Sequence, residues 1–213
     1  MKGVSFSMLD RQGNIWLIIP TGIRKVSFLR PTFSRLWPKE DTQVKCIYRD
    51  REGRIWISTK EDGRVRVYDR ALRPLGYLTA DGRIARQPAS FGHAVYCIYQ
   101  DRKDIMWLGT KPDGLFRLQK RGNGFAITRF VKGKQPKSLN CNTVYDITEG
   151  PDGKLWLATF GGGINIMTHQ NGSVAFLNKD NGLSRWPKRM KENRVRKLLF
   201  TPSGVLIAAT TEG

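Results

Sequence analysis

One stretch of the chain, residues 144–159, reads VYDITEGPDGKLWLAT. We expect two antiparallel strands in it, joined by a hairpin turn whose Asp-Gly step tolerates a positive φ. The second strand alternates leucine with tryptophan and alanine, so both of its faces are apolar. A strand that is apolar on both faces is normally covered on both faces. This stretch therefore predicts a sheet that packs between two neighbours.

The same pattern returns along the whole chain. Its anchor positions, which lie 40, 51, 49 and 51 residues apart, are Trp16, Trp56, Trp107, Trp156 and, in the fifth copy, Ile207. A valine stands twelve positions before each anchor, at Val4, Val44, Val95, Val144 and Val195. Two positions after the anchor, four copies carry a small residue, which would leave room for the tryptophan: Ser58, Gly109, Ala158 and Ala209.

Each copy is predicted to contain four antiparallel strands. In the fourth copy we place them at residues 144–148, 154–159, 163–167 and 173–177. Four strands in 40–50 residues are typical of one blade of a β-propeller. We therefore expect an all-β propeller with four-stranded antiparallel blades, in an incomplete arc of four blades plus part of a fifth. The predicted blade bounds are 1–43, 44–94, 95–143, 144–194 and, incomplete, 195–213.

The chain is strongly basic. It has 213 residues and a formal charge of +19, from 37 Lys and Arg against 18 Asp and Glu. A field of this size favours an anionic partner, although a soluble protein can also simply be basic. Nucleic acid is not expected as a partner, because no recognition fold accompanies the charge. We expect no segment of this chain to span a membrane, since it has no apolar run of about 18 residues, and we expect no signal peptide within these residues.

Residues for metal or catalytic chemistry are few. Cys46, Cys97 and Cys141 form no Cys-x-x-Cys pair, and His93 and His169 stand 76 positions apart. This spacing fits no zinc site. We therefore expect no metal and no cofactor. Without a nucleophile and base in a recognisable motif, we also expect no enzymatic activity in this chain.

Several segments resemble one known family. Two copies carry the motif Val-x-x-Ile-x-x-Asp, from Val44 to Asp50 and from Val95 to Asp101. The fourth copy is preceded by the segment Ser-Leu-Asn-Cys-Asn-Thr-Val, residues 138–144. These residues resemble the two-component regulator propeller repeat, and the resemblance covers essentially the whole chain. Three departures are the short first copy, Asp104 in place of glycine and Ile207 in place of tryptophan.

The resemblance implies a role in signalling. It implies the periplasmic sensor region of a hybrid two-component sensor of gut bacteria, which binds an oligosaccharide and signals to a histidine kinase absent from this chain. The positive charge suggests that the oligosaccharide is acidic. The parent sensor would self-associate or dimerise, and it would meet the membrane only through parts outside this chain. The alternative that stays open is a protein-interaction propeller that binds no small ligand.

The candidate binding residues lie in the loops that lead into the first strand of each blade, here called the lead-in loops, at residues 33–43, 80–93, 132–142 and 180–193. Variable loops on a rigid scaffold are where binding specificity usually lies. Tryptophan can stack on a sugar, and arginine pairs with carboxylate or sulfate. The candidates are Arg35, Trp37, Lys39, Arg86, His93, Arg185, Trp186, Lys188 and Arg189. As alternatives, the two tryptophans fill gaps between blades, the cations are solvated, and His93 satisfies local backbone groups.

Overall fold

The computed structural model describes residues 6–9, 14–19, 22–27, 43–60, 62–134, 138–170, 173–181 and 193–211. The chain forms two compact units, residues 1–41 and 42–213. The described part of the first unit is one antiparallel sheet of β1 (Phe6–Leu9), β2 (Asn14–Ile19) and β3 (Gly22–Ser27), in that order. Trp16 pairs with Met8 on one side and with Lys25 on the other.

The second unit contains four sheets in succession. The first contains β4 (Val44–Arg49), β5 (Ile55–Thr59), β6 (Val65–Tyr68), β7 (Pro74–Leu78) and β8 (Ile84–Ala85). The next contains β9 (Ala94–Gln100), β10 (Met106–Lys111), β11 (Leu115–Arg121) and β12 (Gly124–Phe130). The third contains β13 (Val144–Glu149), β14 (Leu155–Thr159), β15 (Gly163–Gln170) and β16 (Ser173–Leu177). The last contains β17 (Val195–Phe200) and β18 (Leu206–Thr210).

These sheets confirm the predicted all-β architecture with four-stranded antiparallel units. Among the described residues, the sheets of β1–β3 and β17–β18 have three and two strands, and one sheet gains a fifth strand, β8, which pairs with β7 inside the lead-in loop predicted at residues 80–93. Its cause is local, because Gly82 has a φ of +87° and its N–H donates to the carbonyl of Thr79. The turn reverses the chain and adds a fifth, two-residue strand to this sheet.

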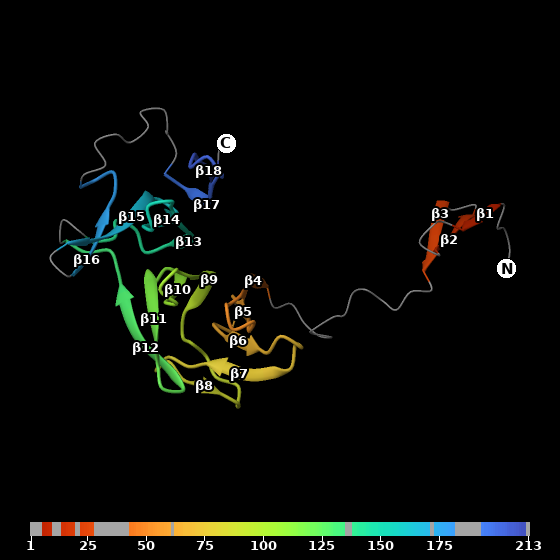
Figure 1. Ribbon diagram of the computed structural model, residues 1–213, viewed down its shortest axis with the longest axis horizontal. Coiled ribbons are helices and arrows are strands. Elements are labelled where there is room, and N and C mark those ends of the chain that lie inside the picture. The colour runs from red at the N-terminus through yellow and green to blue at the C-terminus, as the bar shows by residue number, and fades with distance from the viewer. Residues whose placement is uncertain are drawn as a thin grey trace. The chain divides into compact units, whose positions relative to one another are not determined.

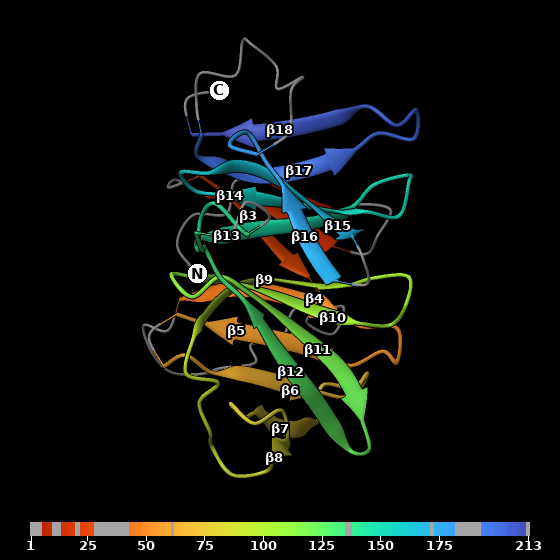
Figure 2. The same ribbon diagram turned by 90° about the vertical axis from the view of Figure 1, so that its left-hand side faces the viewer.

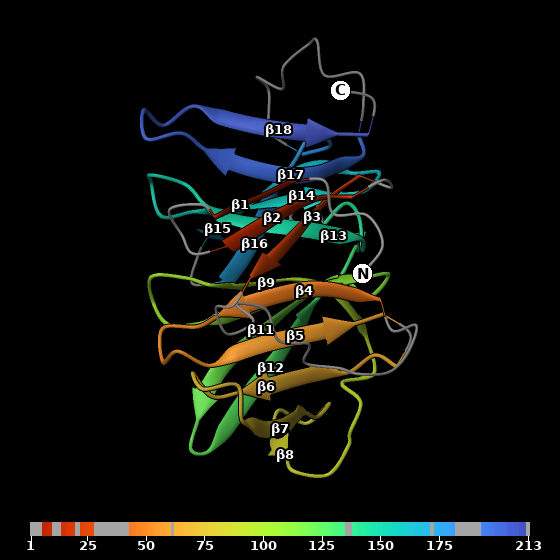
Figure 3. The same cartoon turned by 90° about the vertical axis from the view of Figure 1, so that its right-hand side faces the viewer.

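The first strands of the four sheets lie side by side. β4 contacts β9, β9 contacts β13, and β13 contacts β17. Figure 1 shows these strands together on one side of the second unit, with β12 and β16 on the other. Figure 2 views the unit from the β12 and β16 side, and Figure 3 shows β9, β13 and β17 one above another. Stacked sheets of this kind cover each other's apolar faces, as the doubly apolar strands require.

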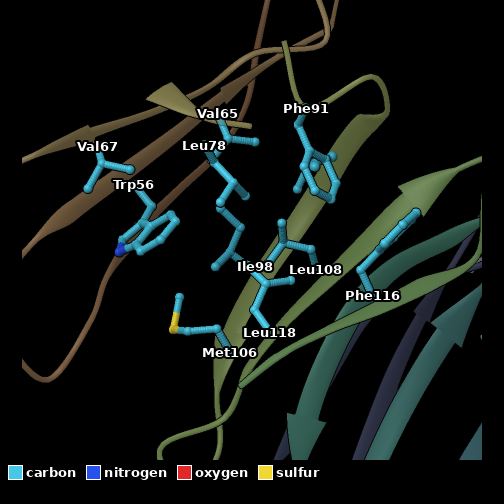
Figure 4. Packing of buried hydrophobic residues seen from close by; sticks show 11 residues of the cluster. Trp56, Val65, Val67, Leu78, Phe91, Ile98, Met106, Leu108, Phe116 and Leu118 are labelled. Atoms are coloured by element: carbon cyan, nitrogen blue, oxygen red, sulfur yellow. The ribbon is translucent and has the colours of Figure 1, made fainter. Parts of the chain in front are cut away.

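Each tryptophan anchor of the second unit packs against the following sheet. Trp56 is fully buried in a cluster with Leu78 of its own sheet and Leu108 of the next (Figure 4). Trp107 is 2% exposed and clusters with residues of β14. Trp156 packs edge-on against Phe200, with ring centroids 5.4 Å apart. The predicted wedges between sheets are therefore confirmed for these three anchors, whereas Ile207 is 51% exposed.

The small residues after the anchors have a role in addition to the one expected. A Cβ built on Gly109 would overlap Sγ of Cys97 in its own sheet, and it would lie only 2.8 Å from Cγ1 of Val144 and 2.9 Å from the Val144 carbonyl oxygen in the next sheet. In the same column, Ser58 donates a hydrogen bond of 2.8 Å to the carbonyl of Val95. Small size at this position therefore lets the first strand of the next sheet pack closely against the second strand, and the room it leaves for the tryptophan stays a prediction.

The hairpin between the first two strands of each sheet in the second unit has one residue with positive φ. Gly53, Gly153 and Gly204 supply it, with φ between +74° and +81°. Asp104 takes the same conformation at +61°, although it carries a side chain. Its carboxylate accepts a hydrogen bond from Arg51, at 2.5 Å. The departure from glycine is therefore accommodated without changing the turn.

Candidate functional site

A β-bulge occurs at the same place in all four first strands of the second unit. The pairing register between the first and second strands shifts by one residue directly after the valine of each copy. The shift lies between Val44 and Cys46 in β4 and at the matching places in β9, β13 and β17. A bulge leaves one residue unpaired and redirects its side chain. The four bulged residues are Lys45, Tyr96, Tyr145 and Arg196.

The four bulged side chains form a continuous row. Nζ of Lys45 lies 5.4 Å from the ring centroid of Tyr96. The rings of Tyr96 and Tyr145 are 5.0 Å apart. The guanidinium of Arg196 lies 5.0 Å from the centroid of Tyr145. We call this row, with its two rings between two cations, the axial ladder.

The axial ladder extends to Phe160, in the turn between β14 and β15. The Phe160 ring lies 5.3 Å from that of Tyr145, and the Arg196 guanidinium lies 4.6 Å from its centroid. Arg194 approaches the same ring at 5.8 Å. Because the chain enters each first strand at this end, the ladder lies on the side of the molecule that carries the lead-in loops.

A groove of about 570 Å³ runs along the first strands beside the ladder. Its one buried carboxylate, Asp146, is 4% exposed and already paired: it accepts from Nζ of Lys197 at 2.7 Å and from the backbone N–H of Leu198 at 2.9 Å. Within the described ranges, no carboxylate pairs with Lys45 or Arg196. The groove therefore offers aromatic faces together with positive charge that an anionic ligand can neutralise.

The two cysteines that line this groove are not reactive. Burial raises the pKa of the Cys46 thiol to about 11, and it also raises that of Cys97, which is 6% exposed. A nucleophilic cysteine needs a lowered pKa, because the thiolate is the reactive form. Both thiols therefore stay protonated at neutral pH and contribute packing.

Of the residues predicted for the site, the structure describes Arg86 and His93. Arg86 is exposed after β8. Nδ1 of His93 lies 2.9 Å from a carboxylate oxygen of Asp113, and its ring packs 4.6 Å from that of Phe116. The structure thus holds His93 against β11 and the turn before it. The other candidates lie outside the described residues: Arg35, Trp37, Lys39, Arg185, Trp186, Lys188 and Arg189.

Three asparagines fix the lead-in loop before β13. Asn165, fully buried on β15, donates to the side-chain oxygen of Asn140 at 2.9 Å. Asn178, 1% exposed, donates to Asn165 at 3.1 Å and to the carbonyl of Ser138 at 3.3 Å. Buried amides are stable only when they are hydrogen-bonded in this way. The network ties this part of the lead-in loop to β15 and to the residue that follows β16.

The axial ladder and the asparagine network were not predicted from the sequence. The ladder residues do share one repeat column, eleven positions before each anchor, and two of them are tyrosines. That column is a usable signal, but the bulge that directs its side chains depends on pairing between strands. In the part of the chain that the structure covers, no group of three His, Cys, Asp or Glu residues could hold a metal ion. Nor does any helix there have the length and apolarity to span a membrane.

The stacked four-stranded sheets and their axial first strands define a β-propeller architecture. Residues 39–61, 90–111 and 138–161 match the family described as two component regulator propeller. The chain therefore carries two-component regulator propeller repeats. No curated protein matches it significantly.

Three solved structures are similar to this chain. PorZ, an essential surface component of the type-IX secretion system of Porphyromonas gingivalis, matches with a TM-score of 0.57 and 19% identity, over 99% of this chain and 31% of that protein. The extracellular domain of a putative hybrid two-component system of Bacteroides thetaiotaomicron matches with a TM-score of 0.55 and 16% identity. The match covers 97% of this chain and 34% of that domain. A protein of unknown function from Bacteroides caccae matches with a TM-score of 0.51 and 9% identity. The match covers 96% of this chain and 69% of that protein.

These similarities establish the fold. The chain spans about a third of the length of the first two structures.

Proposed function

We propose that this chain is part of the extracytoplasmic sensor propeller of a hybrid two-component system, located in the periplasm, and that it binds an acidic oligosaccharide. The propeller repeats and the similarity to an extracellular domain of such a system support the sensor role. In this proposal the histidine kinase and the membrane helix belong to the parent protein. Dimerisation of that sensor stays a prediction.

The axial ladder is the observation that carries the ligand class. Tyr96 and Tyr145 offer aromatic surface of the kind that packs against the C–H face of a sugar ring. Lys45 and Arg196, which flank them, suit the carboxylate of a uronic acid or a sulfate ester. A ligand that spans the ladder would contact all four first strands, so its binding would couple the sheets to one another. Such coupling shifts a conformational equilibrium only when the ligand binds one state more tightly.

The test is calorimetric binding of sulfated and uronic-acid oligosaccharides to the full chain and its variants. We expect Arg196→Ala to weaken binding about 10-fold to 100-fold, because a hydrogen bond to a charged group contributes about 1.5–3 kcal/mol. Tyr145→Ala should weaken it as well. Arg70→Ala is the matched control, since Arg70 is an exposed arginine of the turn between β6 and β7.

Two results would contradict the proposal. One is equal loss of binding in Arg70→Ala and Arg196→Ala, which would show a response to net charge alone. The other is no binding by the full-length sensor to any acidic oligosaccharide. Specific capture of a protein in that second case would favour the interaction scaffold instead.

A further inference from the structure

A second cavity lies between the sheets that contain β10 and β14, away from the axial ladder. Its volume is about 340 Å³, and it is bordered by the hairpin turns at residues 101–105 and 149–153. Each first strand runs from its lead-in loop to one of these turns, so the cavity opens on the opposite side of the propeller from the ladder.

One wall of this cavity carries an arginine in a position that is apolar in the neighbouring sheets. Arg117 on β11 pairs directly across from the anchor Trp107. The matching partner of Trp56 is Val67, and that of Trp156 is Ile166. Both aliphatic residues are buried, at 1% and 6% exposure. The sheet of β9–β12 therefore places a cation where its two neighbours place an aliphatic side chain.

The guanidinium of Arg117 is incompletely paired. One terminal nitrogen, Nη2, donates to the hydroxyl of Thr128 at 3.2 Å. Its Nε is buried and, within the described part of the chain, has no hydrogen-bond acceptor. A buried donor without a partner is unfavourable, and more so when the group is charged. A native fold retains such a group at a stability disadvantage, which is common where the group serves binding.

The carboxylates around the cavity are already engaged. Asp101 accepts from the indole Nε1 of Trp107 at 2.8 Å and also from two backbone N–H groups. Glu149 accepts from the hydroxyl of Tyr99 at 3.3 Å and from the backbone N–H of Arg102 at 3.2 Å. The third carboxylate, at Asp152, pairs with Lys154 at 2.6 Å. None of the three forms an ion pair with Arg117.

The remaining lining fixes the kind of ligand. Trp107, Leu155 and Met167 are 2%, 1% and 6% exposed and give the cavity an apolar floor. Arg102 and Lys103 stand exposed at its rim. We propose that this cavity binds a small organic carboxylate with an apolar body, whose carboxylate pairs with Arg117 and whose body rests on the floor. The site is distinct from the axial ladder and does not depend on the oligosaccharide proposal.

The test uses benzoate as the probe and benzyl alcohol as its uncharged counterpart, with the full chain. In ¹H–¹⁵N spectra the Arg117 Nε–H signal is assigned by its loss in Arg117→Met. We expect benzoate to shift this signal saturably and benzyl alcohol to leave it nearly unchanged. Benzoate should also raise the Tm of the wild-type protein but not that of Arg117→Met.

Arg117→Met itself should raise the Tm by about 3 °C without ligand, because it removes the unpaired donor and restores an apolar residue. If this variant does not fold, Arg117→Lys is the alternative, because it keeps the charge but lacks the planar guanidinium that binds a carboxylate through two hydrogen bonds. It should reduce the rise in Tm that benzoate causes. The proposal is wrong if benzoate produces no saturable shift. It is also wrong if both probes act equally, or if Arg117→Met responds to benzoate like the wild type.

Discussion

At the scale of single residues, a carboxylate holds the indole of two tryptophan anchors. Six positions before Trp56 and Trp107 stand Asp50 and Asp101, and each accepts the indole N–H at 2.8 Å. The fourth copy has Gly150 at this position. There, within the described residues, the buried Nε1 of Trp156 has no acceptor. The repeat thus pairs its anchor in two sheets and leaves it unpaired in a third.

We expect Asp101→Ala to lower the free energy of unfolding by about 2–4 kcal/mol. The change leaves the buried indole N–H of Trp107 unsatisfied and removes two bonds that close the hairpin turn. Urea denaturation monitored by circular dichroism measures this loss. Asp152→Ala, at the exposed turn of the fourth copy, is the control and should cost about 1 kcal/mol or less. An equal loss of unfolding free energy in the two variants would show that the hydrogen bond to the Trp107 indole adds nothing to stability.

At the scale of the elements, close contact between successive first strands determines how the sheets stack. The residue two after each anchor faces the first strand of the next sheet, as Gly109 faces Val144 and Ser58 faces Val95. The bulge next to each of these valines then directs the ladder side chains. Stacking and ligand-site geometry therefore depend on the same short segment of strand.

Gly109→Ala should lower the free energy of unfolding by about 2–3 kcal/mol, since the added methyl overlaps Sγ of Cys97 in its own sheet and both Cγ1 and the carbonyl oxygen of Val144 in the next. Ser58→Ala, in the same column, already has room for its Cβ and should lose only its hydrogen bond, about 1 kcal/mol. Thermal unfolding of the two variants is the comparison. If Gly109→Ala leaves the free energy of unfolding unchanged, the sheets can move apart without loss of stability and the prediction is wrong.

At the scale of the whole molecule, the dominant property is the formal charge of +19. Many acidic groups are committed to local pairs, such as Asp50 with Arg54 at 2.6 Å and Asp62 with Arg66 at 2.6 Å. The excess positive charge therefore remains available to attract anions. It acts over distances that salt shortens, from a Debye length of about 30 Å at 0.01 M to about 3 Å at 1 M.

The proposed acidic ligand should bind at least about tenfold more weakly at 1 M salt than at 0.01 M, because screening removes the long-range attraction. Isothermal titration across salt concentrations measures the slope. The double variant Lys45→Ala/Arg196→Ala should flatten it more than Arg70→Ala does. A neutral oligosaccharide should show no such slope. If the affinity for an acidic ligand does not change with salt concentration, the electrostatic part of the proposal is wrong.

Much of the fold could be predicted from the sequence, whereas most of the site could not. The strand Ser173–Leu177 was predicted at its observed bounds, because turn residues flank an apolar run. The short strand β8 was missed, because the hairpin turn that creates it lies inside a segment with the composition of a loop. Seven of the nine candidate site residues lie outside the described residues, so their role stays a prediction.

The repeat period and the stacking of sheets follow from the chain alone, because its strands are apolar on both faces and no helical period is present to supply another cover. The axial ladder and the cavity beside Arg117, whose guanidinium is only partly paired, depend on residues about fifty positions apart being brought into contact. Lys45 meets Tyr96, and Arg117 lines a cavity with Met167, only after neighbouring copies have stacked. Local propensity cannot encode such contacts, since the geometry of each arises from the register between separate strands and sheets.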